Sequence, residues 1–500
     1  MNVGKILRTT ASRLPDKKAV IFGDRSISFK ELNQGADRVA EFLANQRVEK
    51  GDRVGIILPN CPEFVITYFG TIRLGAVGVP LDIRLKRDEL IPILKDADVK
   101  AVFIPWDKFK EMRPGLGEIE YLNTVVASEG DLPETYNLQS ILAGEAPLSL
   151  TEVEIDEEDE ALYLYTSGTT GKPKGVVLTF RNLSCFPLTM ERMIGAGEND
   201  VIGFILPVSH ISGPIICNLM AFHGSTMVIF SHLRPDRVLK DIEKYRVNYF
   251  HAVPPIFQSL LRVPRKDRYN LKSLSFVAMM GTSVPVQLIQ EFKRTFPWVK
   301  VIQGYGLTET SPFISLLPLE HAETKIGSVG LPVPEIEIKI IDEKGKEVPR
   351  GEIGEIVVKG PMVMKEYHNN PEATKERIRN GWLYTGDLGR IDNEGFLYHL
   401  GRKDDMIIVG GLNVFPAEIE NVLVKHPDIL EAGVVGIPDE DRGQVVKAVV
   451  VLKKGKVLEK KDIISFCRQH LADYKVPKRV EFRDFLPKTS TGKVFRKELI

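Results

Sequence analysis

Apolar and polar residues alternate in two different rhythms along the first part of this chain. Ser28–Asn45 and Glu63–Leu74 carry apolar residues at the spacing of one helical face, whereas Arg53–Leu58 and Ala76–Pro80 are short apolar runs that predict strands. Helical segments that alternate with short buried strands are typical of layered α/β folds with mainly parallel strands. We therefore expect a sheet covered by helices in this region.

The same alternation returns after Glu160. Short apolar runs again predict strands, and amphipathic stretches between them predict helices. The predicted strands are Ala161–Tyr165, Val201–Leu206, Met227–Phe230 and Leu274–Met280, and the predicted helices are Pro235–Tyr245 and Pro285–Thr295. Two lobes that each contain a sheet are therefore expected before residue 320.

The stretch His210–Phe230 contains no Asp, Glu, Lys or Arg, and it has about the length of a membrane-spanning helix. Ser212-Gly213-Pro214 and His223-Gly224-Ser225-Thr226 interrupt it, however. The pattern instead predicts a buried helix, a glycine turn and a strand at Met227–Phe230.

The last third of the sequence has a different pattern of apolar, Gly and Pro residues. Between about residues 325 and 400, strands such as Glu335–Ile341 and Glu355–Lys359 lie between Gly and Pro turns and predict a small β subdomain. A compact block follows the charged segment Gly401–Asp405. Its predicted helices are Pro416–Lys425 and Lys460–Leu471, and its predicted strands are Ile429–Ile437 and Val445–Leu452.

The predicted fold class is α/β, with two layered α/β sheet lobes and the β subdomain in a large N-terminal domain. A small, mobile α+β domain follows at the C-terminus, because a compact block joined through a short charged linker can move as a rigid body. The expected boundaries are residues 1–401 for the N-terminal domain, 402–405 for the hinge and 406–500 for the C-terminal domain.

Composition agrees with a globular protein that acts on small molecules. Basic and acidic residues number 67 each, and 43% of residues are hydrophobic and 27% charged. Net charge therefore suggests no nucleic-acid partner and no anionic membrane, although a peripheral membrane contact or a homodimer stays possible. Four cysteines stand far apart with no C-x-x-C pair, which predicts no zinc site and a cytoplasmic location.

An eleven-residue stretch, Tyr165–Gly175, follows directly on an apolar strand. It contains three glycines, four Ser or Thr hydroxyls and two lysines. Glycines let backbone N–H groups turn inward, hydroxyls donate hydrogen bonds and lysines supply positive charge, which is the chemistry that a triphosphate requires. The stretch does not match the P-loop pattern, and by itself such a loop is more often a plain surface turn.

The whole stretch resembles the phosphate loop of the adenylate-forming superfamily, which includes acyl-CoA synthetases, peptide-synthetase adenylation domains and luciferases. Further motifs arrive in the family's order, and the resemblance covers the chain from about residue 15 to 498. It implies an acid–thiol ligase that uses ATP, Mg²⁺ and coenzyme A. The implied nucleotide-binding residues of the loop are Thr166, Ser167, Gly168, Thr169, Thr170, Gly171 and Lys174.

Two further motifs resemble the segments that border the adenine and the α-phosphate. Gly304–Thr310 matches the first, and the resemblance implies that Thr308 meets the α-phosphate and that Glu309 binds Mg²⁺ together with Thr166. One carboxylate can hold this hard cation because phosphate oxygens supply other ligands. The second motif, Gly281–Pro285, departs from the family, which more often has Gly or Ala around its centre. The implied contacts to adenine are Gly281, Thr282, Ser283, Gly304, Tyr305 and Gly306.

The same resemblance implies which residues contact the ribose and which form the hinge of the moving domain. Tyr384–Gly389 resembles the segment whose Asp387 accepts hydrogen bonds from both ribose hydroxyls, and a carboxylate suits a vicinal diol. Gly401–Asp405 resembles the family hinge, in which Arg402 contacts the ribose and Asp404 is the pivot. The glycine pair Gly410 and Gly411 is implied to edge the tunnel for the pantetheine arm of coenzyme A.

A lysine near the C-terminus completes the implied site. Pro487–Val494 resembles the last motif of the family, which makes Lys493 the catalytic lysine. Attack of a carboxylate on the α-phosphorus builds negative charge on phosphate oxygens, and a cation stabilises that charge. Rotation about Asp404 would then withdraw Lys493 and open the thiol tunnel for the second step.

The acyl side of the site is predicted from one histidine and several apolar stretches. His210, in Leu206–His210, resembles the family side chain near the acyl carboxylate, although a lone histidine on an apolar run is more often a core residue. The stretches carry no Asp or Lys, so an amino-acid substrate is not expected. The predicted walls are His210–Phe222, Tyr249–Phe257, Met279–Gly281 and Gly306–Leu307.

The acid itself stays open at this point. A medium- to long-chain fatty acid is the first expectation and an aryl or cyclic acid the second, because apolar walls select weakly by size. An acyl-AMP ligase that loads a carrier protein and a luciferase-like oxidation are further alternatives. A nonenzymatic nucleotide or acyl sensor with this fold is a different class, and loss of Lys493, Glu309 or Asp387 would mark it, but all three are present.

Overall fold

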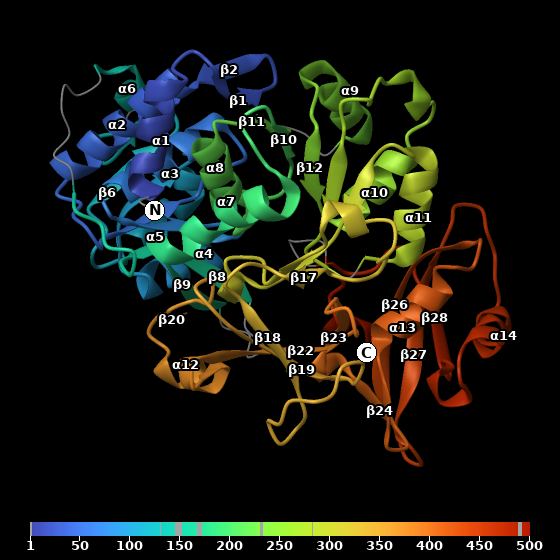
Figure 1. The fold of residues 1–500 in the computed structure, drawn as a ribbon. Helices are drawn as coiled ribbons and strands as arrows, with labels where there is room; N and C mark the ends of the chain where they lie inside the picture. The colour runs from blue at the N-terminus through green and yellow to red at the C-terminus, as the bar shows by residue number, and fades with distance from the viewer. Residues whose placement is uncertain are drawn as a thin grey trace.

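The chain forms several sheets that are layered with helices in its larger part and a separate sheet near its C-terminus (Figure 1). The structure is a computed structural model, and it describes residues 3–130, 132–145, 153–167, 173–230, 234–282, 284–488 and 493–500. The first helix, α1 (Val3–Arg13), packs against α2 (Phe29–Asn45) and α8 (Ser212–His223). The N-terminal segment therefore belongs to the core of the larger part.

An eight-stranded sheet forms the first lobe, with the strand order β20-β9-β8-β4-β3-β5-β6-β7. Its central strands are parallel, and β9 returns antiparallel to β8. The strands are β3 (Arg53–Ile56), β4 (Val77–Pro80), β5 (Val99–Ile104), β6 (Thr124–Ala127), β7 (Tyr136–Asn137), β8 (Glu160–Ser167), β9 (Pro173–Thr179) and β20 (Glu366–Tyr367). The helices of this lobe include α3 (Pro62–Arg73), α4 (Arg87–Asp96), α5 (Trp106–Leu116), α6 (Leu138–Ala143) and α7 (Phe180–Ile194).

A seven-stranded sheet forms the second lobe, with the order β14-β13-β12-β10-β11-β1-β2. Its strands are parallel except for the edge strand β2. The strands are β1 (Lys18–Phe22), β2 (Arg25–Ser28), β10 (Val201–Phe204), β11 (Thr226–Ile229), β12 (Tyr249–Ala252), β13 (Phe276–Met279) and β14 (Lys300–Ile302). The helices α9 (Pro235–Tyr245), α10 (Pro254–Leu261) and α11 (Val286–Thr295) connect strands of this lobe.

The expectation of two α/β lobes is confirmed, but chain order does not divide the strands between them. The N-terminal strand β1 pairs with β11 of the second sheet, with Val20 opposite Met227. Conversely, β8 joins the first sheet beside β4, where Leu162 lies opposite Gly78. A Cβ atom at Gly78 would lie 3.0 Å from Leu162 Cδ2, so the missing side chain lets this apolar strand seat closely against the sheet.

The uncharged stretch at 210–230 folds as predicted into helix, turn and strand. Helix α8 ends at Gly224, whose φ of 77° is the left-handed conformation that favours glycine, and β11 follows. Among the helices of the described ranges, none combines the length and the apolar character needed to cross a membrane.

A β subdomain lies between the two lobes and the C-terminal sheet in the chain. Strands β18 (Glu337–Ile341), β19 (Gly354–Lys359), β21 (Ile378–Arg379), β22 (Trp382–Ile391) and β23 (Leu397–Arg402) make one antiparallel sheet. A small second sheet contains β15 (Gly304–Tyr305), β16 (Ser315–Leu316) and β17 (Leu331–Pro332). The short helix α12 (Pro371–Arg377) follows β20, which pairs with β9 and so ties this region to the first lobe.

The C-terminal part has a sheet and a hydrophobic core of its own. Residues such as Val414, Ile419 and Val434 form a buried cluster distinct from those of the lobes. This confirms the predicted division into a large N-terminal and a small α+β C-terminal part. Its strands are β24 (Ile407–Val409), β25 (Leu412–Val414), β26 (Ile429–Asp439), β27 (Gly443–Leu452) and β28 (Arg479–Phe482), and its helices are α13 (Pro416–Leu423) and α14 (Lys460–His470).

Candidate active site

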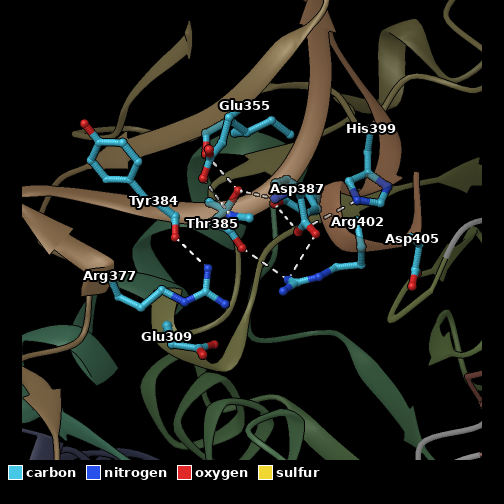
Figure 2. Close-up of polar contacts among 12 residues, drawn as sticks. Glu309, Glu355, Arg377, Tyr384, Thr385, Asp387, His399, Arg402 and Asp405 are labelled. Carbon is cyan, nitrogen blue, oxygen red and sulfur yellow. Dashed lines mark hydrogen bonds and ion pairs between the residues drawn. The ribbon is translucent and has the colours of Figure 1, made fainter. Parts of the chain in front are cut away.

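A buried carboxylate, Asp387 on β22, lies at the centre of the polar cluster in Figure 2. Tyr305 donates its hydroxyl to Asp387 Oδ2 at 2.6 Å, and Arg402 Nη1 lies 3.1 Å from Asp387 Oδ1. The ring of His399 stacks on Tyr305, with 4.8 Å between centroids, and its Nε2 lies 3.8 Å from Asp387 Oδ2. Three residues that the sequence assigned to the nucleotide, Tyr305, Asp387 and Arg402, therefore meet in one cluster.

The β22–β23 hairpin explains how two distant sequence motifs come together. Asp387 lies directly opposite Arg402 in the antiparallel register of this hairpin. The turn before Asp387 is fixed by Thr385, whose hydroxyl donates to the Ile356 carbonyl at 2.7 Å and accepts from the Asp387 N–H. Gly386 follows with a φ of 69°, a left-handed conformation that a glycine adopts without strain.

Asp387 is ionised in this environment. Burial by itself raises the pKa of this carboxyl, but the interactions with His399, Arg402 and the Tyr305 hydroxyl outweigh it and hold the pKa below its usual value. The side chain is 3% exposed. A buried carboxylate with paired oxygens and fixed neighbours is suited to accept hydrogen bonds from two hydroxyls.

A second acidic residue, Glu309, is labelled in Figure 2, below the Asp387 cluster in this view. It belongs to the short 3₁₀ turn Thr308–Thr310, and Tyr367 donates its hydroxyl to Glu309 Oε1 at 2.7 Å. Lys174, at the end of the glycine-rich loop, stands over the Tyr367 ring with 5.4 Å between Nζ and the ring centroid. Tyr367 thus links the phosphate-loop region to Glu309.

The few acidic side chains around Glu309 suit a metal ion that phosphate oxygens, rather than protein atoms, bind for the most part. Among the described residues, no group of three or more His, Cys, Asp or Glu side chains is arranged to hold a metal by itself. Mg²⁺ keeps several water or phosphate ligands and needs only one or two protein carboxylates. Glu309, with one oxygen held by Tyr367, therefore fits a magnesium that arrives with ATP.

The segment from Gly304 to Thr308 requires glycine at its centre. A Cβ atom at Gly306 would lie 1.6 Å from the Pro312 carbonyl oxygen, so no larger residue fits without moving the backbone. Gly281 has a φ of 88°, which glycine again favours, and it follows β13 at the carboxyl edge of the sheet. Thr282 is half-buried there, and Ser283 lies outside the described residues.

The two ends of the glycine-rich loop are held by a β-hairpin. Thr166 on β8 lies opposite Lys174 on β9, and Ser167 lies opposite Pro173. The predicted contacts at Gly168, Thr169, Thr170 and Gly171 lie outside the described residues. The hairpin brings Thr166 and Lys174 to the same end of the first sheet.

Lys493 reaches the site from the C-terminal part of the chain. Desolvation by the surrounding protein lowers the pKa of its ammonium, with Asp387, Arg402 and Glu309 as its charged neighbours. The side chain keeps contact with solvent, as expected for a group in a concave site. The charges that act on Lys493 therefore come from the turn that carries Glu309 and from the Asp387–Arg402 pair.

His210 is near enough to Lys493 for the lysine charge to influence its ring, and it is neutral. Burial, with a smaller contribution from the charge of Lys493, lowers its pKa to about 4. The backbone N–H of Ser212 donates to His210 Nδ1 at 3.3 Å, so Nδ1 accepts and the proton of the neutral ring is on Nε2.

The predicted hinge is held on both of its sides. Arg402 donates to the Thr385 carbonyl, Lys403 pairs with Glu355 at 3.2 Å, and Asp405 pairs with Arg496 of the C-terminal part at 3.2 Å. Asp404 is exposed, and no hydrogen bond or ion pair of its side chain is present within the described ranges. Gly410 and Gly411 lie at the tip of the β24–β25 hairpin, with φ angles of 58° and 82°.

Sequence reasoning missed several side chains of the cluster. His399 and Tyr367 contact Asp387 and Glu309, and Arg377 donates to the Tyr384 carbonyl at 2.9 Å. None of the three stands in a motif that was singled out. His399 reaches the site on β23 and Tyr367 on β20, whereas Arg377 is the last residue of helix α12. The wall stretches were also treated as apolar, yet Asn218, Tyr249 and His251 in them are buried polar residues.

Comparison with known proteins agrees with the motifs. The sequence profile described as "AMP-binding enzyme" matches residues 7–368, and the profile "AMP-binding enzyme C-terminal domain" matches residues 418–493. A long-chain-fatty-acid–CoA ligase of Bacillus subtilis (strain 168) is 37% identical over 99% of this chain and 93% of its own length. A feruloyl-CoA synthase of an Amycolatopsis species is 35% identical over 97% of this chain and 96% of its own.

Solved structures agree as well. The crystal structure of the anthranilate CoA ligase AuaEII in complex with anthranoyl-AMP superposes with a TM-score of 0.92, at 28% identity, over 100% of this chain and 96% of that chain. The fold, the order of motifs and both family profiles thus agree. The chain belongs to the AMP-binding enzyme family, and it is an adenylate-forming enzyme of the acyl-CoA synthetase type.

Proposed function

We propose that this enzyme converts a carboxylic acid and ATP into an acyl-adenylate and pyrophosphate, and then transfers the acyl group to coenzyme A with release of AMP. The observation that carries the proposal is the convergence of Lys493, Glu309 and the Asp387 cluster, which come from distant parts of the chain. One anionic nucleotide that spans these groups would explain the whole arrangement.

In the first half-reaction, the substrate carboxylate displaces pyrophosphate from the α-phosphorus. No protein nucleophile is needed, because positioning and electrostatic stabilisation are sufficient for such a displacement. Asp387 holds the ribose, and the Lys493 ammonium stabilises the charge that develops on the phosphate oxygens. When bound at Glu309 and Thr166, Mg²⁺ supplies further neutralisation of phosphate charge.

The neutral His210 suits a position beside the substrate carboxylate. Its Nε2–H is a donor that carries no charge at neutral pH, so it can orient a carboxylate oxygen without neutralising the nucleophile. In the second half-reaction, the thiol of coenzyme A attacks the mixed anhydride after the C-terminal domain, residues 406–500, turns about the hinge 402–405. The glycine pair Gly410 and Gly411 would then border the pantetheine arm, as glycine permits close approach.

For the acid, we propose two classes. A medium- to long-chain fatty acid is supported by the relative from Bacillus subtilis, whose name is a long-chain-fatty-acid–CoA ligase. An aryl acid is supported by relatives named feruloyl-CoA synthase and anthranilate CoA ligase. The proposed walls carry no Asp or Lys side chain, which disfavours an amino acid in either case.

Pyrophosphate release tests this function directly. Purified enzyme with ATP and Mg²⁺ is offered fatty, aromatic and amino acids, each with and without coenzyme A. We expect sustained release only with a fatty or aromatic acid together with coenzyme A. Release that ignores coenzyme A would point to a carrier protein or another acceptor, and no release with any acid would favour a nucleotide or acyl sensor.

The rate of acyl-adenylate formation should depend on pH on the alkaline side. The protonated Lys493 is the active form, and its lowered pKa means that the ammonium is lost at a lower pH than in free lysine, which titrates near pH 10.5. His210 stays neutral down to pH of about 4, so it should add no transition between about pH 6 and 8.

Single-turnover measurements of acyl-adenylate formation from about pH 6 to 10.5 check this expectation. Lys493→Arg, whose guanidinium stays charged throughout, should keep some activity and lose the alkaline decline. An unchanged alkaline decline in Lys493→Arg would show that another group titrates.

A further inference from the structure

A buried histidine, His251 on β12, has a ring nitrogen without a partner. His251 is 4% exposed, and no protein atom of the described residues hydrogen-bonds to its Nδ1. Most buried polar side-chain atoms in folded proteins are hydrogen-bonded, and leaving one unsatisfied costs about 1–3 kcal/mol. A polar ring kept in this position therefore needs an explanation.

The strand places this ring on the face of the sheet that belongs to the large core between the lobes. Phe250 and Ala252 belong to the other cluster, under α9 to α11, so His251 points to the opposite side. In the sheet register, its neighbours are Phe204 on β10 and Ala278 on β13. Both neighbours are apolar, so neither can satisfy the imidazole.

The remaining neighbours of His251 lie toward the active site. The ring of Phe313 is 6.3 Å away between centroids, and His210 is near enough to influence the ionisation of His251. The charge of Lys493 in turn influences His210. His251 lies opposite Phe204, the last residue of β10, and His210 follows β10, so both histidines lie toward the carboxyl edge of the sheet, in the part of the chain that the proposed function assigns to the acyl group.

The His251 ring does not carry a positive charge. Burial, together with the nearby His210, lowers its pKa to about 4, so the ring is neutral at physiological pH. A neutral imidazole has one N–H donor and one acceptor nitrogen. It can therefore bind a hydroxyl or a carbonyl oxygen, whereas a carboxylate or an ammonium would not gain a charge partner there.

We propose that His251 is a specificity-determining residue that hydrogen-bonds an oxygen substituent of the acyl group, so that the enzyme selects carboxylic acids bearing a hydroxyl or keto group near the carboxylate. This inference rests on the proposed function, because it places the substrate carboxylate beside His210. An unsubstituted acid would fill the same space but leave the imidazole unsatisfied.

The position of the substituent follows from the strand geometry. His251 lies toward the same carboxyl edge of the sheet as His210, which the proposed function places at the carboxylate, so the recognised oxygen would lie within a few bonds of the carboxyl carbon. Tyr249, on the same face of β12, lies about 6.6 Å further along, as two residues of a strand do. Within the described part of the chain its hydroxyl also lacks a hydrogen-bond partner, and its ring is stacked on Phe276. Tyr249 therefore provides a comparison at a more distant position on the same wall.

Matched pairs of acids test the proposal. We expect kcat/KM for thioester formation to be at least about tenfold higher for an oxygenated acid than for its parent, because sites built to bond a hydroxyl discriminate strongly against analogues that lack it. The pairs are benzoate with 2-, 3- and 4-hydroxybenzoate, and octanoate with 3-hydroxyoctanoate and 3-oxooctanoate. His251→Phe should reduce the ratio by about tenfold, whereas His251→Asn, which keeps a donor and an acceptor, should retain part of it.

The readout is the ratio of kcat/KM for an oxygenated acid to kcat/KM for its parent acid within one variant. Unfolded enzyme lowers both values equally, so it does not change this ratio. Tyr249→Phe should leave the ratio for substituents next to the carboxylate unchanged, and His470→Phe, at an exposed position on α14, controls for the substitution itself. Turnover of the parent acids with ratios near one, unchanged in His251→Phe, would overturn the inference while the ligase function stands. No pyrophosphate release from any of these acids or from the wider panel would overturn the proposed function and the inference with it.

Discussion

Replacement of Lys493 by alanine is expected to lower the rate of acyl-adenylate formation by about 10²- to 10³-fold, which is the usual effect of removing one group that stabilises developing charge. The ammonium of Lys493 has Glu309, Asp387 and Arg402 as charged neighbours, and partial desolvation by the surrounding protein lowers its pKa. Charge that appears on phosphate oxygens in such a place interacts more strongly than it would in water.

The same substitution should spare the second half-reaction. In our proposal the C-terminal domain has turned away by then, so Lys493 no longer contacts the reacting atoms. Synthetic acyl-adenylate offered with coenzyme A should therefore be converted to the thioester at a rate within about threefold of the unaltered enzyme. Stopped-flow pyrophosphate release and thioester formation measure the two steps separately.

A control for Lys493→Ala is available in the same domain. Lys454 is exposed in the turn after β27, and Lys454→Ala should affect neither step. Equal losses in both half-reactions of Lys493→Ala would contradict the role proposed for this lysine, and would indicate instead that it contributes to the folding or docking of the C-terminal part.

The sequence predicted many of the elements because their apolar periodicity is strong. Helix α9 has the predicted bounds Pro235–Tyr245, β11 is shifted by one residue toward the N-terminus, and β19 begins one residue earlier than predicted. Sheet membership was not predictable in the same way. Which strand β1 or β8 pairs with depends on contacts between residues far apart in the chain, such as Val20 with Met227 and Gly78 with Leu162, and a local pattern does not encode them.

The residues of the candidate site also fall into those that a local motif predicts and those that only the strand pairing reveals. The resemblance named Asp387 and Arg402, and the structure brings them together through a strand register that no motif expresses. The contacts of His399 and Tyr367 arise from two different strand pairings, β22 with β23 and β20 with β9, so neither residue was noticed. His251 was overlooked for another reason, because a single histidine inside an apolar run is usually interpreted as part of the core.

The second large effect on the two half-reactions is expected at the predicted hinge, residues 402–405. Arg402 and Lys403 are held by the N-terminal part through Asp387 and Glu355, whereas Asp405 is held by Arg496 of the C-terminal part. Asp404 lies between these two sets of ion pairs, and its exposed side chain makes none of them. A rotation of one part against the other would therefore concentrate its torsional change at this residue.

Asp404→Pro should accordingly separate the two half-reactions in the direction opposite to Lys493→Ala. Residues Lys403–Asp405 form a 3₁₀ turn, whose φ angles of about −50° to −70° include the value that proline enforces. The ring permits the present conformation, in which Lys493 lies in the site, but it blocks a large change in φ. We expect acyl-adenylate formation within about threefold of normal and thioester formation lowered by at least about 10²-fold.

Asp404→Ala is the matched control, because it removes the same carboxylate but leaves the backbone free to rotate. It should support both half-reactions at nearly normal rates. If Asp404→Ala and Asp404→Pro impair thioester formation equally, the carboxylate rather than the torsion is responsible. If Asp404→Pro leaves both steps intact, the domain does not turn at this residue, and the adjacent positions held by Glu355 and Arg496 become the candidates for the pivot.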